Sequence, residues 1–310
     1  MLTIFRSTEF GKLVPLNEFE KGCWVKLNQP TQEELQRVET ALGVREDFLR
    51  DALDEEERAR VEKEEDSTML IVEIPRMSAD RQEKISTVPL GIFINDNCFV
   101  TVCMEETPIL TDFCAGKVKH FHTHMKTRFL LQILHRIADY YLYYLKRINH
   151  KRERLENELH QSVRNKELLA MLELEKSLVY FTTSLTKNNI LLKKLINGNA
   201  LRMYEEDQEL LEDVIIETKQ AIAMTEVYSS IMSSMMSAFG SVVSNNVNHV
   251  VKLLTSITIV LALPTMISSI YGMNVELPLQ EHPNAFSLIM VMSAVSALVT
   301  SLIFWKKRFF

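Results

Sequence analysis

The sequence predicts an α+β membrane protein with an N-terminal α/β domain, a stalk of long helices and two C-terminal membrane-spanning helices. Three observations predict this class. Runs rich in β-forming residues are confined to residues 1–125. No proline occurs between Ile109 and Leu263, so little interrupts helix over a very long stretch. Residues 253–271 and 285–305 contain no charged side chain, which is typical of membrane spans.

Residues 1–125 are expected to form the α/β domain. Short apolar and β-branched runs predict strands at residues 23–27, 68–74, 88–94 and 98–102. Thr31 can start a helix that runs to Leu42. Gly43 can end that helix before a second one over residues 45–53. The pattern predicts a sheet covered by helices, and it leaves the order of the strands open.

Residues 126–249 are expected to form the stalk of long antiparallel or coiled helices. Apolar side chains recur there at helical spacing, for instance Leu130, Ile133, Leu134, Ile137, Tyr141, Tyr144 and Ile148. Breaks are expected near Asn165 and at residues 197–199, where turn-forming residues occur. After the second break, helix is expected to continue from about Tyr204 through the first membrane span to Tyr271.

Residues 250–310 are expected to form the transmembrane domain, with spans at 253–271 and 285–305 and an outer loop at 272–284. At a rise of about 1.5 Å per residue, either run crosses a hydrocarbon core of roughly 30 Å. Lys252 precedes the first span and three basic residues, 306–308, follow the second, whereas the loop between the spans contains neither lysine nor arginine. Because basic residues favour the cytoplasmic side, we expect a multi-pass protein of the cell membrane with both termini in the cytoplasm.

The composition argues against several classes of function. A net charge of −6 disfavours a nucleic-acid-binding protein. No glycine-rich phosphate loop, HExxH motif or Ser/His/Asp arrangement can be found, so we expect neither an enzyme nor an organic cofactor. The four cysteines form no CxxC pair, which argues against a thiolate zinc site.

One face of the first span is small and polar. Residues three or four apart share this face, namely Asn248, Val251, Thr255, Thr258, Ala262, Thr265, Ser269 and Gly272. Small and hydroxyl side chains often serve only to pack helices together. Asn248 at one end of the face, Pro264 within the span and a glycine at the other end favour a water-lined pore instead. Two spans cannot enclose a pore, so such a pore would lie on the axis of a ring of identical chains.

The strongest motif is Tyr271-Gly272-Met273-Asn274, which follows the proline-containing span. A second motif, residues 244–248, leads into residues 252–255 at the other end of that span. With a short acidic loop, a second span and a basic tail, the chain resembles the CorA family of divalent-cation channels along its whole length. The resemblance implies a homopentamer in the lipid membrane that takes up Mg²⁺ along its gradient, with the first span lining the pore and the four-residue motif ringing its outer mouth.

The resemblance also implies roles for single residues. Asn248 would form a polar ring near the cytoplasmic mouth, and Leu254 a hydrophobic constriction. Val251 and Ala262 depart from the larger methionines that can narrow the pore in this family. Asp213 matches a regulatory carboxylate that holds Mg²⁺ with acidic residues of a neighbouring chain's N-terminal domain. Its candidate partners are Glu62, Glu64, Glu65 and Asp66. An ordinary solvated face is the alternative for these charge runs.

Three alternatives remain open at this stage. The string His120, His122 and His124 could bind a transition metal if it formed a strand, but the lysines around it favour a solvated linker. The same scaffold could transport Zn²⁺, Co²⁺ or Ni²⁺ rather than Mg²⁺. The chain could also be a membrane-anchored coiled-coil sensor or scaffold, in which the polar face of the first span merely packs.

Overall fold

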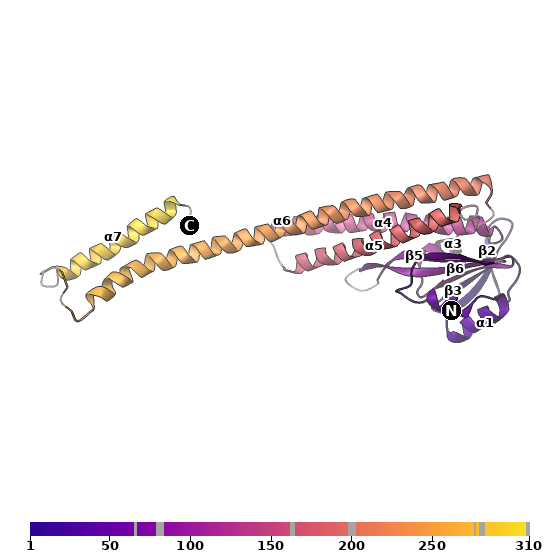
Figure 1. Ribbon diagram of the computed structural model, residues 1–310, viewed down its shortest axis with the longest axis horizontal. Helices are drawn as coiled ribbons and strands as arrows, with labels where there is room; N and C mark the ends of the chain where they lie inside the picture. Colours follow the sequence, from indigo (N-terminus) through magenta and orange to yellow (C-terminus); the bar gives the residue numbers. More distant parts are fainter. Residues whose placement is uncertain are drawn as a thin grey trace. The chain divides into compact units, whose positions relative to one another are not determined.

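The computed structural model describes residues 1–64, 67–78, 84–161, 165–197, 203–275, 277–278 and 283–307 (Figure 1). The chain divides into two compact units, Met1–Ser234 and Met235–Phe310. The helix α6 (Glu205–Tyr271) begins in the first unit and ends in the second. The predicted class, an α/β part followed by long helices and two apolar C-terminal helices, is confirmed.

Among the described residues, seven strands form one sheet in the order β2-β1-β3-β7-β6-β5-β4. The strands are β1 (Leu2–Ser7), β2 (Leu13–Leu16), β3 (Cys23–Asn28), β4 (Arg60–Lys63), β5 (Ser67–Met77), β6 (Ile85–Asn95) and β7 (Cys98–Cys103). β3 and β7 pair in parallel, with Val25 opposite Val100, and the other neighbours pair antiparallel. The parallel pair therefore joins two antiparallel halves into one sheet.

The four predicted strands lie within β3, β5, β6 and β7. The turn between β6 and β7 is held by Asn95, whose side-chain Oδ1 accepts hydrogen bonds from the backbone N–H groups of Asn97 and Cys98. β1, β2, β4 and the short helix α3 (Pro108–Cys114) were not predicted from the sequence. β2 and β4 are edge strands of four residues each, too short to give an alternating pattern.

Helices α1 (Gln32–Leu42) and α2 (Glu46–Asp51) confirm the two helices predicted in this part of the chain. Thr31 and Glu34 form a capping box at the start of α1, and Gly43 ends it with a φ of 68°. Phe48 of α2 belongs to a core cluster with residues of the sheet. A Cβ atom at Gly91 would lie 2.5 Å from the Cβ of Ala52, so glycine allows the close approach of α2 to β6.

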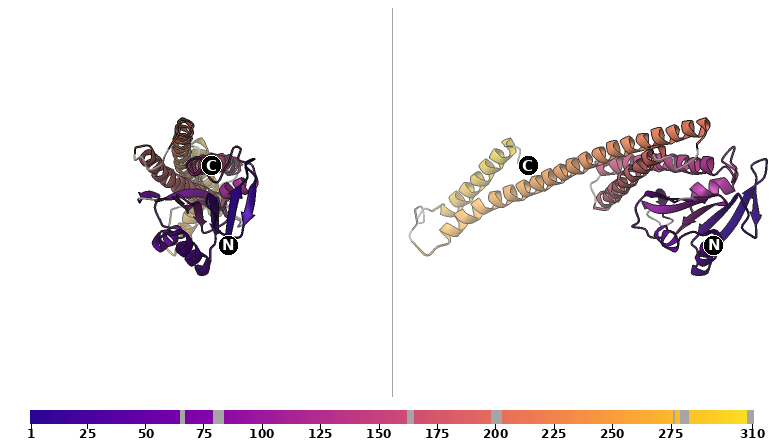
Figure 2. Two further views of the ribbon diagram at one scale, coloured as in Figure 1. Left: turned by 90° about the vertical axis from the view of Figure 1, so that its right-hand side faces the viewer. Right: turned by 45° about the vertical axis from the view of Figure 1, so that its right-hand side comes forward.

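The other helices of the first unit are α3, α4 (Lys126–Gln161), α5 (Asn165–Asn197) and the beginning of α6 (Figure 2). α4 and α5 contact the sheet at β5. Tyr141 of α4 donates a hydrogen bond of 3.0 Å to the backbone oxygen of Glu73 in β5. The predicted break near Asn165 is the start of α5, whereas Gly198 and Asn199 of the second predicted break lie outside the described residues.

Residues 120–124 form turns and irregular structure between α3 and α4, not a strand. His120 has a φ of 53°, and the rings of His122 and His124 lie 5.3 Å apart. The strand that would align the three imidazoles on one face is therefore not formed. The expectation of a linker is confirmed.

The second unit contains the end of α6 and the helix α7 (Ala285–Lys306). In the described part of the chain, α6 and α7 are the two helices that are long and apolar enough to cross a membrane. The predicted spans lie within them. Their apolar side chains are largely exposed in the single chain: Leu254 is 65% exposed, Leu261 64% and Leu298 62%.

Candidate functional site

The predicted polar face of α6 is exposed along its whole length in the single chain. Asn248, Thr255, Thr258, Thr265 and Ser269 are all exposed. A different side of this segment is buried, and the fully buried Ser256 lies on it. The polar face is therefore not used to pack the two spans of one chain together.

Hydroxyl groups on α6 donate to carbonyl groups of their own helix. Thr258 Oγ1 donates to the oxygen of Leu254 at 2.8 Å, and Thr265 Oγ1 donates to the oxygen of Leu261 at 2.7 Å. Since each hydroxyl has one proton, its oxygen is left facing outward as an acceptor only. Pro264 lies inside the helix and has no N–H, so it leaves the carbonyl group of Val260 without its helical donor. A row of oxygen acceptors suits a cation or its water shell.

The motif Tyr271-Gly272-Met273-Asn274 lies where α6 ends. The backbone N–H of Gly272 donates to the oxygens of Ser268 and Ser269, at 3.1 and 3.2 Å. Tyr271 donates its phenolic proton to the oxygen of Pro278 at 3.3 Å, which fastens the loop to the helix end. Met273 and Asn274 are exposed. The motif thus presents its backbone and its amide outward at the end of a membrane span.

In the described part of one chain, neither the dihedral angles nor the contacts require glycine at position 272. Its φ is not in the left-handed region, unlike that of Gly43. A Cβ atom there would lie 3.5 Å from the nearest backbone oxygens, which is ordinary contact. The backbone at Gly272 is therefore ordinary for the end of a helix.

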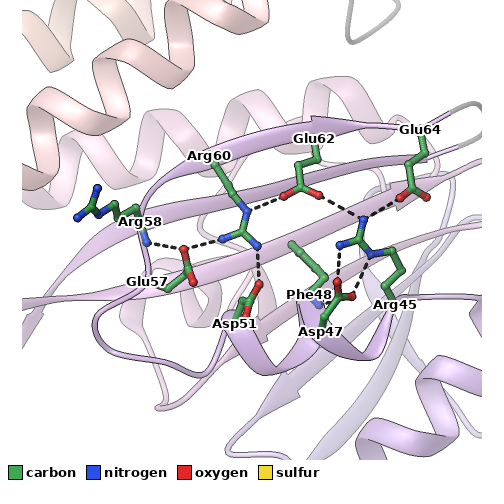
Figure 3. A network of polar contacts seen from close by, with 9 residues as sticks. All are labelled: Arg45, Asp47, Phe48, Asp51, Glu57, Arg58, Arg60, Glu62 and Glu64. Carbon is green, nitrogen blue, oxygen red and sulfur yellow. Dashed lines mark hydrogen bonds and ion pairs between the residues drawn. The ribbon is translucent and has the colours of Figure 1, made fainter.

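Asp213 is exposed on the part of α6 that belongs to the first unit. Two of its candidate partners are already paired within the chain, as Figure 3 shows. Arg45 Nη1 lies 3.0 Å from Glu64 Oε1 and 3.4 Å from Glu62 Oε2. Arg60 Nε lies 2.7 Å from Glu62 Oε1. The other two candidates, Glu65 and Asp66, lie outside the described residues.

Arg45 and Arg60 form ion pairs with further carboxylates in the same network (Figure 3). Arg45 also pairs with Asp47 at 2.5 Å, and Arg60 pairs with Asp51 and Glu57, each at 2.6 Å. The hydrogen bond from Arg45 lowers the pKa of Asp47. Five carboxylates share two guanidinium groups, so the network keeps a net negative charge.

A group of possible metal ligands that the sequence analysis missed joins α4 and α6. His135, Asp139 and Glu217 each offer one ligand atom, and these atoms lie within 4.8 Å of one another. A hydrogen bond to Asp139, the charge of Glu217 and the more distant charge of Asp213 raise the pKa of His135. Burial raises the pKa of Glu217. The spacing of His135 and Asp139 by one helical turn was visible in the sequence, but Glu217 is 82 residues further along.

The comparison with known proteins decides the family. The family described as "CorA-like Mg2+ transporter protein" matches residues 19–308. The chain belongs to the CorA family.

Two CorA relatives and one solved CorA structure match nearly the whole chain. The cobalt/magnesium transport protein CorA of Methanocaldococcus jannaschii is 30% identical, with 98% of each chain covered. The protein of the same name from Thermotoga maritima is 21% identical and covers 98% of this chain and 88% of its own length. The complete structure of the CorA magnesium transporter from M. jannaschii has a TM-score of 0.84 at 28% identity, with 98% of this chain and 97% of that chain covered.

The predicted site residues of this CorA protein fall into separate groups. The pore-face residues lie on the last part of α6 or at its end, and the four-residue motif begins at its last residue, all in the second unit. Asp213, Glu62 and Glu64 lie in the first unit, where the two glutamates face Arg45 rather than a free cation site. Their roles as selectivity, pore and regulatory residues remain predictions.

Proposed function

We propose that this protein is a channel-like transporter that moves divalent cations, chiefly Mg²⁺, across a membrane. One observation carries the proposal: in a chain of the CorA family, the motif Tyr271-Gly272-Met273-Asn274 ends a membrane span whose polar face is exposed. The gradient and the membrane potential would drive uptake. A divalent ion gains roughly twice 2.3 kcal/mol for each 100 mV that it crosses.

The pore requires several copies of the chain, and we propose a homopentamer. The exposed face of α6 from Asn248 to Ser269 would line the central axis, where its hydroxyl oxygens and the free carbonyl of Val260 accept hydrogen bonds from the water around the ion. Leu254, which is 65% exposed, would form a hydrophobic ring that controls wetting of the pore. Lipid would cover the remaining apolar surface of α6 and α7.

The motif would form the outer mouth of this pore. Mg²⁺ releases its water reluctantly and prefers six oxygen ligands, so neutral oxygens can receive the hydrated ion without holding it tightly. The amide of Asn274 and the carbonyl of Gly272 offer such oxygens. Because a Cβ atom at position 272 meets no clash within one chain, we attribute the need for glycine to close approach between neighbouring copies.

We propose that cytoplasmic Mg²⁺ closes the pore by binding between Asp213 of one copy and acidic residues of a neighbour's N-terminal domain. Facing carboxylates repel each other unless a cation lies between them. Glu62 and Glu64 already share Arg45, so an ion would have to compete with a guanidinium group there. This competition favours weak binding, which a sensor of abundant Mg²⁺ needs. Glu65 and Asp66 remain candidates.

The proposed organisation follows the expected domains: residues 1–125 as the cytoplasmic domain, 126–249 as the stalk and 250–310 as the membrane domain. Both termini would be cytoplasmic, because Lys252 and residues 306–308 flank the spans on that side. Labelling of a Glu281→Cys variant, in a chain without its four native cysteines, tests the orientation. Glu281 lies outside the described residues, and labelling only from the cytoplasmic side would refute this topology.

Ion flux into liposomes that contain only this protein tests the function. We expect saturable Mg²⁺ uptake that increases with an inside-negative potential. Parallel measurements with Co²⁺, Ni²⁺ and Zn²⁺ rank the cations. No flux of any divalent cation would favour the sensor or scaffold, and preference for Zn²⁺ over Mg²⁺ would favour the other transport alternative.

A further inference from the structure

α4 and the beginning of α6 contact each other within the first unit. The two helices pack through apolar side chains, since Leu134 and Ile137 of α4 line the same small cavity as Val214 of α6. Arg128 of α4 also pairs with Glu206 of α6 at 2.6 Å. This packing holds the side chains of His135, Asp139 and Glu217 next to one another at the edge of the contact.

The imidazole of His135 lies between two carboxylates. Its Nδ1 is 3.4 Å from Asp139 Oδ2, and its Nε2 is 3.5 Å from Glu217 Oε1. Both distances are longer than good hydrogen bonds between charged groups. The second oxygen of Glu217, Oε2, is buried and has no hydrogen-bond partner among the residues that the structure describes. The three side chains thus lie close together, but they do not supply one another with all the hydrogen bonds that they can form.

Negative charge exceeds positive charge around this imidazole. Asp139, Glu217 and Asp213 all act on His135 electrostatically. Arg136 is a positive neighbour, 3.2 Å from Asp139, but it also pairs with Asp112 at 3.1 Å. A bound divalent cation would balance this excess of negative charge.

We propose that His135, Asp139 and Glu217 form a binding site for one divalent transition-metal ion, such as Zn²⁺, Co²⁺ or Ni²⁺, within each chain. Imidazole nitrogen together with carboxylate oxygen suits these ions, whereas Mg²⁺ prefers oxygen ligands alone. Bond lengths of about 2.0–2.2 Å require the most distant ligand atoms to approach by on the order of 1 Å. Because one ion binds only one nitrogen of the ring, the carboxylate that faces the other nitrogen would have to turn toward the ion. Rotation of these half-buried side chains would supply this movement, and water would complete the coordination.

The site differs from the proposed Mg²⁺ sensor in its ligands and in its chemistry. All three ligands belong to one chain, and one of them is a nitrogen. Asp213 would contribute only through its charge, as a neighbour one helical turn before Glu217 on α6. The bound ion would fasten α4 to α6, the helix that continues into the first membrane span. The site does not depend on transport activity.

Titration of the full-length protein with Co²⁺ in detergent, in a large excess of Mg²⁺, tests the proposal. The Mg²⁺ fills sites made of oxygen ligands alone, and the visible absorption of Co²⁺ reports the remaining site. We expect one Co²⁺ per chain, displaced by Zn²⁺. His135→Gln and Glu217→Gln each remove one ligand. Loss of a group that only hydrogen-bonds to a metal ligand already weakens metal binding by roughly tenfold or more, so we expect each variant to weaken Co²⁺ binding by at least that factor.

His150 provides the matched control. It lies on α4, 3.6 Å from Glu153 of the same helix, and among the described residues it belongs to no group of possible metal ligands. His150→Gln should leave Co²⁺ binding unchanged. Thermal unfolding without metal shows whether each variant is folded, and Glu217→Gln tests the site separately from the imidazole. Absence of saturable Co²⁺ binding, or equal binding by wild type and both ligand variants, would overturn the proposal. Failure of Mg²⁺ flux would refute the proposed transport but would leave this site standing.

Discussion

The two compact units place the same kinds of side chain in opposite surroundings. In Met1–Ser234, large apolar side chains such as Leu27, Phe99 and Phe129 are fully buried. In Met235–Phe310, Leu254, Leu261 and Leu298 are each more than 60% exposed. Exposed apolar surface of this extent indicates lipid or other protein chains as its natural cover. The first unit completes its own core, whereas the second depends on what surrounds it.

Polar side chains also differ between the two units in their burial and in their partners. In the first unit, Glu73 is buried and pairs with Lys187 at 2.6 Å, and it also accepts a hydrogen bond from Ser184. In the second unit, Thr258 and Thr265 bond to the backbone of their own helix. Substitutions of buried residues in the first unit should therefore act on stability, and those on the exposed face of the second unit should act on assembly or transport.

The largest effect is expected at the end of α6. Asn274→Ala removes the exposed amide, and Gly272→Val places a branched side chain where one chain alone has room for it. Both variants should lose most Mg²⁺ flux in liposomes and still form the oligomer. Val275→Ala, next to the motif, should keep most of the flux. Full flux in both motif variants would show that the motif only caps the helix.

A pair of core and surface substitutions tests the contrast in burial directly. The ring of Phe129 is fully buried and lies 5.2 Å from Trp24 and 4.2 Å from Phe99. Phe129→Ala should lower the free energy of unfolding by about 3–5 kcal/mol. The fluorescence of Trp24, in a Trp305→Phe background, can follow the unfolding.

Leu261→Ala is the comparison, because this side chain is 64% exposed in the single chain. It should leave the unfolding transition reported by Trp24 nearly unchanged. A loss of stability equal to that of Phe129→Ala would mean that the two units do not unfold as separate cores.

Asp112 offers a smaller effect that depends on pH. Its side chain is buried and contacts Lys117 at 2.7 Å, Tyr140 at 2.8 Å and Arg136 at 3.1 Å. Burial alone would raise the pKa of Asp112, but these three partners outweigh it and lower the pKa. Since the pKa is lower in the folded state, the stabilisation is present above the unfolded value of about 3.9 and is lost as pH falls through the folded value.

Asp112→Asn should therefore lower the free energy of unfolding at neutral pH by about 1.5–3 kcal/mol and should lessen its dependence on pH on the acid side. Denaturant unfolding at several pH values checks this. The exposed Asp213→Asn serves as the control, because it should change stability by less than about 0.5 kcal/mol. An equal loss of stability at every acidic pH would contradict the assigned role of the carboxylate.

The smallest effect is expected in regulation. Asp213→Asn removes one charge from each proposed intersubunit site, so it should shift Mg²⁺ inhibition of flux to higher cytoplasmic Mg²⁺ by a few fold without changing which ions pass. Flux measured against cytoplasmic Mg²⁺ for both proteins checks this. Superimposable curves would return Asp213 to an ordinary solvated position.

Local patterns predicted the elements that local forces dominate. Thr31 and Gly43 delimit α1 as their capping chemistry requires, and the two uncharged runs lie within α6 and α7. Contacts between distant parts of the chain were not predictable in this way. The parallel pairing of β3 with β7 joins residues 75 positions apart, and Glu217 reaches His135 only because α4 and α6 pack together. The pairing of Glu62 and Glu64 with Arg45 likewise depends on how α2 approaches the edge of the sheet.

The parallel pairing of β3 with β7 sets an order for the synthesis of this protein. β3 cannot pair with β7 until Cys103 has been translated, because β7 ends at this residue and follows the other strands of the sheet in the chain. Ser184 and Lys187, which contact the buried Glu73, follow still later. Both events precede translation of residue 253, the start of the first apolar run. Since domains fold in order as the chain is made, the sheet and the helices that contact β5 can be complete on the ribosome before the membrane-insertion machinery receives its first segment.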